Sequence, residues 1–139
     1  MSEKIDAKRI YSSLSLAYIG DGVYEAFIRS QLLKNGDMRV KDLHKKAKNY
    51  VSAKSQFLIF NEIEESLTEE ELGVYKRGRN TKVHTIAKNA NANEYHVATG
   101  LEALIGYLYL SEKKERLEEV LFLCYDAANK ISENSKKGL

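Results

Sequence analysis

A nearly uncharged stretch of the chain reads Val97-Ala-Thr-Gly-Leu-Glu-Ala-Leu-Ile-Gly-Tyr-Leu108, and its one charged residue is Glu102. Helices that are apolar nearly all round are buried in a protein core, so we expect a central helix over about 94–110. The chain has no proline and eight glycines, whereas β-sandwiches and barrels draw on both residues for their many turns. The expected fold class is therefore all-α.

Apolar residues recur at helical steps of three and four on both sides of this stretch. They predict helices over about 10–33, 40–50 and 52–66, and Gly36 stands where the first of these would end. Thr68 and Glu71 have the spacing of a capping box, which predicts a short helix to about residue 76. Ser111 can cap a last helix that runs through Ala128, whereas the polar residues of about 78–93 predict a flexible basic loop.

Length and composition indicate a single domain over residues 1–139 that does not span a membrane. The chain has 139 residues, the size of one compact domain. Its longest stretch without an Asp, Glu, Lys or Arg covers only residues 10–20, whereas a membrane-spanning helix needs about 20 apolar residues. The N-terminus lacks the basic start and apolar core of a signal peptide, and the single cysteine, Cys124, leaves no disulfide framework. We expect a cytoplasmic protein, with Cys124 in its core.

Two carboxylates stand in unexpectedly apolar surroundings. Glu102 lies in the central stretch, and Asp21 interrupts a second apolar run, with Glu25 one helical turn later. Carboxylates from separate core helices could converge as oxygen ligands for Mg²⁺, with Mn²⁺ as the alternative ion. The other interpretation is that each acid is neutralised by Arg or Lys or caps a helix end, as buried acids usually are paired. Gly20 and Gly22 beside Asp21 indicate close backbone packing or a helix boundary.

Basic side chains gather in two segments and acidic ones in a third. Residues 34–56 hold seven Lys or Arg, and residues 72–93 hold five without an acid. Such segments suit phosphate contacts. The candidate contacts are Lys45, Lys46, Lys54, Arg77, Arg79, Asn80, Lys82, His84 and Lys88. Residues 62–71 hold six glutamates and no base, and we interpret them as solvated surface.

Two motifs resemble those of the ribonuclease III family. The segment Leu16-Ala-Tyr-Ile-Gly-Asp-Gly-Val-Tyr-Glu25 is similar to the family's signature helix, and Thr99-Gly-Leu-Glu-Ala-Leu-Ile-Gly106 is similar to its second acidic motif. The segments Val51-Ser-Ala-Lys-Ser-Gln56 and Lys76-Arg-Gly-Arg-Asn80 resemble the compact Mini-ribonuclease III branch, which lacks the double-stranded-RNA-binding domain. The resemblance covers about residues 10–125.

The resemblance implies an all-helical homodimer with the signature helix at its interface. Asp21 and Glu102 match the family's catalytic, Mg²⁺-binding carboxylates, so each subunit would cut one strand of an RNA duplex and leave 5′-phosphate and 3′-hydroxyl ends. The branch's usual substrate is the paired stem of precursor 23S ribosomal RNA. The implied partners are therefore this RNA and a ribosomal protein or the assembling large subunit, and the basic residues above become candidate RNA contacts.

Two positions depart from the family's full-length members. Ala17 and Thr99 stand where those members place further acids, one turn before Asp21 and Glu102. The Mini-ribonuclease III branch shares both departures, which leave the number of metal ions open. They also favour one alternative function, a non-catalytic RNA-binding or ribosome-assembly factor on the same fold. A third interpretation rests on residues 62–71, which resemble the acidic helices of all-α nucleotide pyrophosphohydrolases.

Overall fold

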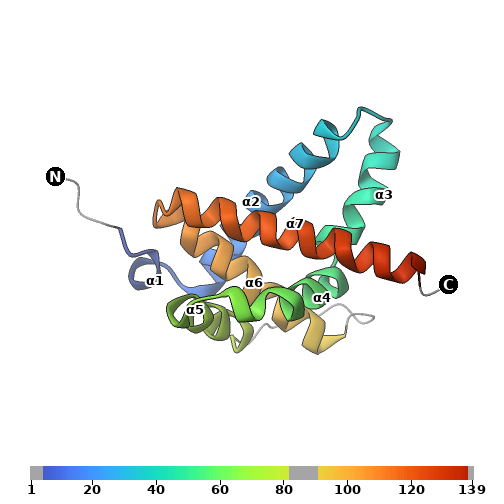
Figure 1. The fold of residues 1–139 in the computed structure, drawn as a ribbon. Coiled ribbons are helices and arrows are strands. Elements are labelled where there is room, and N and C mark those ends of the chain that lie inside the picture. Colours follow the sequence, from blue (N-terminus) through green and yellow to red (C-terminus); the bar gives the residue numbers. More distant parts are fainter. Residues whose placement is uncertain (1–4, 82–90, 138–139) are drawn as a thin grey trace.

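The computed structural model describes residues 5–81 and 91–137, and these residues form helices without a β-strand (Figure 1). The elements are α1 (Ala7–Ile10), α2 (Ser13–Lys34), α3 (Val40–Val51), α4 (Ala53–Ile63), the 3₁₀ turn η1 (Glu64–Ser66), α5 (Glu69–Arg79), α6 (Ala92–Leu110) and α7 (Lys114–Lys137). The predicted all-α class is confirmed. No helix in the described ranges has the length and apolar character that crossing a membrane would require.

Helix α6 is the centre of the fold. It packs against α2, α4, α5 and α7, and Figure 1 shows α7 turning back from the end of α6. Every residue from Val97 to Leu108 is buried except Glu102, which is half-buried. The nearly uncharged stretch therefore forms the core helix that its composition predicts, and Cys124 from α7 is buried in the same core as expected.

Several helix boundaries differ from the predicted ones, because polar side chains cap the helices there. The Ser12 hydroxyl accepts a hydrogen bond from the Ser15 N–H and starts α2, so α1 is separate from it. At the other end of α2, Gly36 follows the cap residue with a φ of +139°, a conformation that glycine readily adopts. The Thr68–Glu71 capping box is present. Helix α5 continues beyond the predicted residue 76 to Arg79, and residues 82–90 of the expected loop lie outside the described ranges.

Ser111 does not cap the last helix as predicted. It ends α6, and its hydroxyl accepts a hydrogen bond of 3.0 Å from the Ala7 N–H. Glu112 then adopts a left-handed φ of 58° before α7 begins at Lys114. The serine hydroxyl is therefore used to attach the N-terminal segment to the end of α6.

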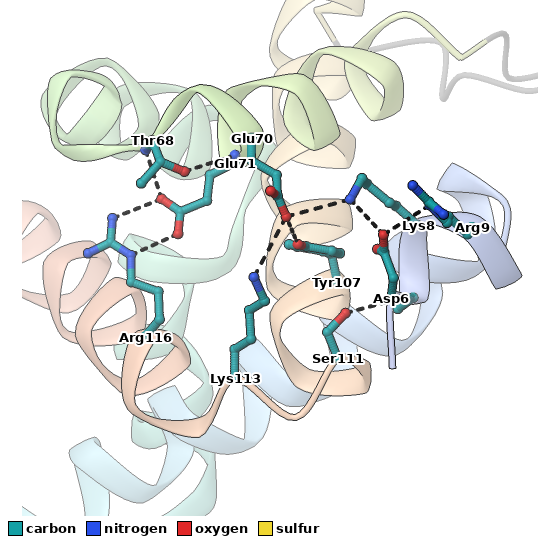
Figure 2. A network of polar contacts seen from close by, with 11 residues as sticks. Asp6, Lys8, Arg9, Thr68, Glu70, Glu71, Tyr107, Ser111, Lys113 and Arg116 are labelled. Carbon is teal, nitrogen blue, oxygen red and sulfur yellow. Dashed lines mark hydrogen bonds and ion pairs between the residues drawn. The ribbon is translucent and has the colours of Figure 1, made fainter. Parts of the chain in front are cut away.

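The interpretation of residues 62–71 as solvated surface is wrong for Glu71 (Figure 2). Its side chain is only 6% exposed and accepts hydrogen bonds of 2.8 Å from both Nε and Nη2 of Arg116 on α7. The neighbouring Glu70 accepts a hydrogen bond from Tyr107 and lies 3.5 Å from Lys8 Nζ. The ion pairs and hydrogen bonds of these two acids join α1, α5, α6 and α7. Counting charges along the sequence could not detect this role.

Candidate active site

Helices α2 and α6 touch through their backbones, and this contact creates the site. A Cβ atom on Gly20 would lie 1.8 Å from the Glu102 carbonyl oxygen, and one on Gly106 would lie 1.9 Å from the Leu16 carbonyl oxygen. Both distances are far below van der Waals contact, so only glycine fits at either position. Because Asp21 follows Gly20, the crossing brings Asp21 beside Glu102. Close packing is thereby confirmed at Gly20 but is wrong for Gly22, where nothing lies within 4 Å of an added Cβ. A helix boundary at Asp21 is also wrong, because α2 is continuous there.

The carboxylate of Glu102 lies in an environment that disfavours its charge. Burial, the charge and hydrogen bond of Asp21, and the charge of Glu25 raise the pKa of Glu102 to about 8, against the opposing hydrogen bond from Gln56. None of the ion pairs formed within the described ranges includes Asp21 or Glu102. Both acids also lie inside helices rather than at their ends. Within the described residues, Asp21 and Glu102 are therefore neither neutralised by a Lys or Arg nor used to cap a helix end.

Two carboxylates that repel each other without a basic partner fit a divalent cation. Their oxygens are the ligands that Mg²⁺ prefers, and Mg²⁺ keeps several waters when the protein supplies few ligands. No group of three or more His, Cys, Asp or Glu side chains with metal-binding geometry occurs among the described residues. A metal site at this crossing would therefore draw on fewer than three such side chains of the described residues.

The comparisons with known proteins agree with this geometry. The family model described as the Ribonuclease III domain matches residues 14–113, which include both carboxylates. The chain belongs to the ribonuclease III family. Within that family it lies in the Mini-ribonuclease 3 branch, as the residues and the relatives show together.

The relatives cover most of the chain. The Mini-ribonuclease 3 of Clostridium tetani is 49% identical over 94% of this chain and 87% of its own length. That of Enterococcus faecalis is 48% identical over 91% of this chain and 95% of its own length. A crystal structure of a Fusobacterium nucleatum protein has a TM-score of 0.73 and 36% identity, covering 84% of this chain and 93% of that one. The family resemblance and the all-α ribonuclease III fold are thus confirmed.

The two positions that depart from the full-length family pattern are not available as ligands. Ala17 is buried on α2. Thr99 is buried on α6, and its hydroxyl donates a 3.0 Å hydrogen bond to the Tyr95 carbonyl oxygen. Glu25, one turn after Asp21, is instead within 3.5 Å of Arg29. Neither of these two positions therefore adds a ligand to Asp21 and Glu102, either in the sequence or in the packed structure.

Two residues of the predicted RNA-binding set flank a close contact between α5 and α6. Gly78 near the end of α5 packs so closely on α6 that its Cβ would be 2.8 Å from Ala103 Cβ. Arg77 and Arg79 flank Gly78 in the chain, so they lie on the turn of α5 that packs on α6. Arg79 also lies over the Tyr75 ring, 5.6 Å from its centroid.

The other predicted RNA contacts are more scattered. Asn80 ends α5 and accepts a 3.1 Å hydrogen bond from Arg79 Nε. Lys54 is exposed in the first turn of α4, whereas Lys45 and Lys46 are exposed on α3. Lys82, His84 and Lys88 lie outside the described residues.

The sequence indicated no role for Gln56, which the structure places beside Glu102. Gln56 of α4 is 2% exposed and donates a 3.2 Å hydrogen bond from Nε2 to Glu102 Oε2. The signal that could have identified it is an amide in a helical run that otherwise buries Ile59, Phe60 and Ile63. Buried polar groups need partners, but the sequence does not say which partner is used.

Proposed function

We propose that the chain is a divalent-metal-dependent endoribonuclease that cleaves double-stranded RNA. Membership of the ribonuclease III family supports the endoribonuclease activity. The observation that carries the metal dependence is the pairing of Asp21 with Glu102 at the α2–α6 crossing, where their mutual repulsion has no Lys or Arg counterpart in the described ranges. These two residues are the proposed catalytic and metal-binding groups.

Asp21 and Glu102 would hold Mg²⁺ or Mn²⁺ between α2 and α6. The bound ion supplies a Lewis acid that activates water and stabilises charge on the scissile phosphate. The two helices orient both carboxylates rigidly, because their backbones are in contact at Gly20 and Gly106. Water and phosphate oxygens would complete the metal's coordination.

The basic residues around the site would hold the RNA backbone. Arg77, Arg79 and Lys54 come from the two helix ends that pack near Glu102, and Lys45 and Lys46 extend the basic surface along α3. An A-form duplex displays phosphates and 2′-hydroxyls across a shallow minor groove, so proteins recognise it mainly by shape. This arrangement supports binding of the duplex by the surface of the ribonuclease III domain itself.

A homodimer is part of the proposal. The N-terminal half of α2 and the residues before it leave large apolar side chains uncovered. Tyr18 is 84% exposed and Ile10 is 61% exposed, with Tyr11 and Leu14 beside them along the chain. Exposed apolar surface of this kind marks protein interfaces. A second copy packed on this face would bring two sites to one duplex, one for each strand.

We further propose precursor 23S ribosomal RNA as the substrate, with a ribosomal protein or the assembling large subunit as partner and the cytoplasm as location. This part rests on the resemblance to the Mini-ribonuclease III branch. The alternative is a non-catalytic RNA-binding or ribosome-assembly factor, and the observation that favours it is the small donor set left by Ala17 and Thr99.

Cleavage of an end-labelled RNA duplex distinguishes these functions. With Mg²⁺ we expect staggered cuts on both strands and no cleavage in EDTA. The Asp21→Asn variant should cleave more than about 100-fold more slowly, because loss of even an indirect partner of a metal ligand lowers activity about 10–100-fold. Asp126→Asn is the matched control, because Asp126 is an exposed acid on α7. Duplex binding without scission in Mg²⁺ and in Mn²⁺ would favour the non-catalytic function.

A further inference from the structure

Gln56 joins the end of α3 to the carboxylate of Glu102. Its Nε2 donates two hydrogen bonds, one of 3.0 Å to the Val51 carbonyl oxygen and one of 3.2 Å to Glu102 Oε2. Its Oε1 is buried and has no hydrogen-bond partner among the described residues. Unpaired buried oxygens are uncommon in native proteins and call for an explanation.

The two acceptors explain why the amide keeps this orientation. A flip would direct Oε1 at the Val51 carbonyl oxygen, which can only accept. It would also lose both hydrogen bonds. Val51 is the last residue of α3, so its carbonyl position is set by the helix. The two hydrogen bonds therefore hold the amide with Nε2 toward Glu102, and this orientation leaves Oε1 without a partner among the described residues.

The amide of Gln56 acts on one oxygen of the carboxylate. Glu102 Oε2 is occupied by the amide, which leaves Oε1 as the less restricted oxygen for a cation. A carboxylate with one oxygen fixed in this way cannot rotate freely about its last torsion. Groups that orient metal ligands from behind are a recurring feature of metal sites.

We propose that Gln56 is a positioning residue of the metal site, which fixes the Glu102 carboxylate so that Oε1 faces the ion. The inference rests on the proposed function, since it requires that Asp21 and Glu102 bind the metal. Gln56 itself contacts neither the ion nor the RNA. Its hydrogen bonds to the Val51 carbonyl oxygen and to Glu102 connect the α3–α4 corner to the carboxylate.

The test is Mn²⁺ binding by the full-length chain without RNA, followed from the electron paramagnetic resonance signal of free Mn²⁺. Gln56→Met keeps the volume and removes the amide, and we expect it to weaken Mn²⁺ binding about 10–100-fold, the usual effect of losing such a partner. The Mg²⁺ concentration for half-maximal cleavage should rise by the same factor, whereas duplex affinity in EDTA should not change. A merely structural role would lower the folded fraction without shifting the metal dependence.

Ser55→Ala is the matched control. The Ser55 hydroxyl donates a 2.9 Å hydrogen bond to the Lys48 carbonyl oxygen in the same α3–α4 corner, and none of its hydrogen bonds within the described residues goes to Glu102. We expect its Mn²⁺ affinity to equal that of the wild type. If Gln56→Met does not fold, Gln56→Ala removes the amide without adding an apolar group beside the carboxylate and serves as the second variant.

The Asp21→Asn variant in the same titration separates the two possible failures. If Asp21→Asn abolishes Mn²⁺ binding while Gln56→Met binds as tightly as the wild type, the positioning role is wrong and the metal site stands. If Asp21→Asn and Gln56→Met both bind Mn²⁺ as the wild type does, the metal site itself is wrong, and the positioning role fails with it.

Discussion

Glu102 carries an electrostatic cost that the fold imposes. Its carboxylate is half-buried, faces Asp21, and receives one compensating hydrogen bond from Gln56. Burial and the repulsion by Asp21 raise its pKa to about 8. A group whose charge is disfavoured in the folded state destabilises that state as it ionises. A cation held between the two carboxylates would remove this cost.

The sign of the resulting pH dependence follows from the raised pKa. An acid with a higher pKa in the folded than in the unfolded state stabilises the fold fully below its unfolded pKa of about 4.5, and this stability is lost as pH rises to about 8. We therefore expect Glu102→Gln to raise the Tm at pH 8 in EDTA relative to the wild type. The difference should reach several degrees, because one pKa unit corresponds to about 1.4 kcal/mol.

Thermal unfolding of both proteins between pH 5 and pH 8 checks this prediction. The gap in Tm should shrink toward pH 5, and addition of Mg²⁺ should raise the Tm of the wild type alone. Equal Tm values for the two proteins at pH 8 in EDTA would show that Glu102 carries no such cost. Asp126→Asn again provides the control for removing a carboxylate at an exposed position.

The basic residues at the start of α4 and near the end of α5 make a separate prediction at the residue scale. If Lys54 and Arg77 contact phosphates, replacing either by Ala should weaken duplex binding and reduce the salt slope of log K by about 1. Binding titrations in EDTA at several salt concentrations measure both quantities. Lys130→Ala is the matched control, since Lys130 is exposed on α7 and lies 3.5 Å from Glu62. Unchanged slopes for Lys54→Ala and Arg77→Ala would place the RNA elsewhere.

The crossing of α2 and α6 is the element on which the site depends. The two glycines that allow it lie at Gly20 and Gly106, and each faces a backbone carbonyl of the other helix. Separating the helices to admit a methyl group would move Asp21 away from Glu102. Glycine inside a helix costs about 1 kcal/mol relative to alanine, so the close approach must more than offset this cost.

Alanine substitution distinguishes the two glycines around Asp21. Gly20→Ala should destabilise the fold by several kcal/mol, because its Cβ would meet the Glu102 carbonyl oxygen at 1.8 Å. Gly22→Ala should leave the fold intact or stabilise it by about 0.4–1 kcal/mol, because nothing lies within 4 Å of its Cβ. Denaturant unfolding measures both changes. A Gly20→Ala variant as stable as Gly22→Ala would refute the close crossing.

The periodicity of the sequence predicted most of these elements, and particular residues show where it failed. The capping box at Thr68 was found correctly because both of its members are local in sequence. Ser111 was assigned to the wrong helix, because its hydroxyl bonds to Ala7, 104 positions away. Glu71 was misjudged for the same reason, since its partner Arg116 lies 45 positions away.

At the scale of the whole molecule, the exposed apolar face that includes Tyr18 sets the expected assembly. Tyr18 is 84% exposed, so a second copy packed on this face would remove a large aromatic side chain from water. We expect Tyr18→Glu to shift the chain from dimer to monomer, because a dimer would have to bury the new charge. Light scattering coupled to size-exclusion chromatography measures the mass, and Val40→Glu, at a 66% exposed position on α3, is the control.

The same variant also tests how the two strands are cut. A monomer should lose the paired, staggered cuts on a duplex, since each subunit of the proposed dimer would carry one site. A wild-type chain that is monomeric at the concentrations of the cleavage reaction would contradict the dimer. A Tyr18→Glu chain that stays dimeric would show that another face forms the interface.

The sequence by itself determined the all-α class, most of the helix ranges to within a few residues, the family motifs and the two candidate carboxylates. These features are encoded locally, in hydrophobic period, capping residues and short motifs. Only the tertiary structure decided that Asp21 and Glu102 meet, that Gln56 donates a hydrogen bond to Glu102 and that Glu71 is buried. The physical reason is distance along the chain: Gln56 and Glu102 are 46 positions apart, and their contact exists only because α2, α4 and α6 pack together.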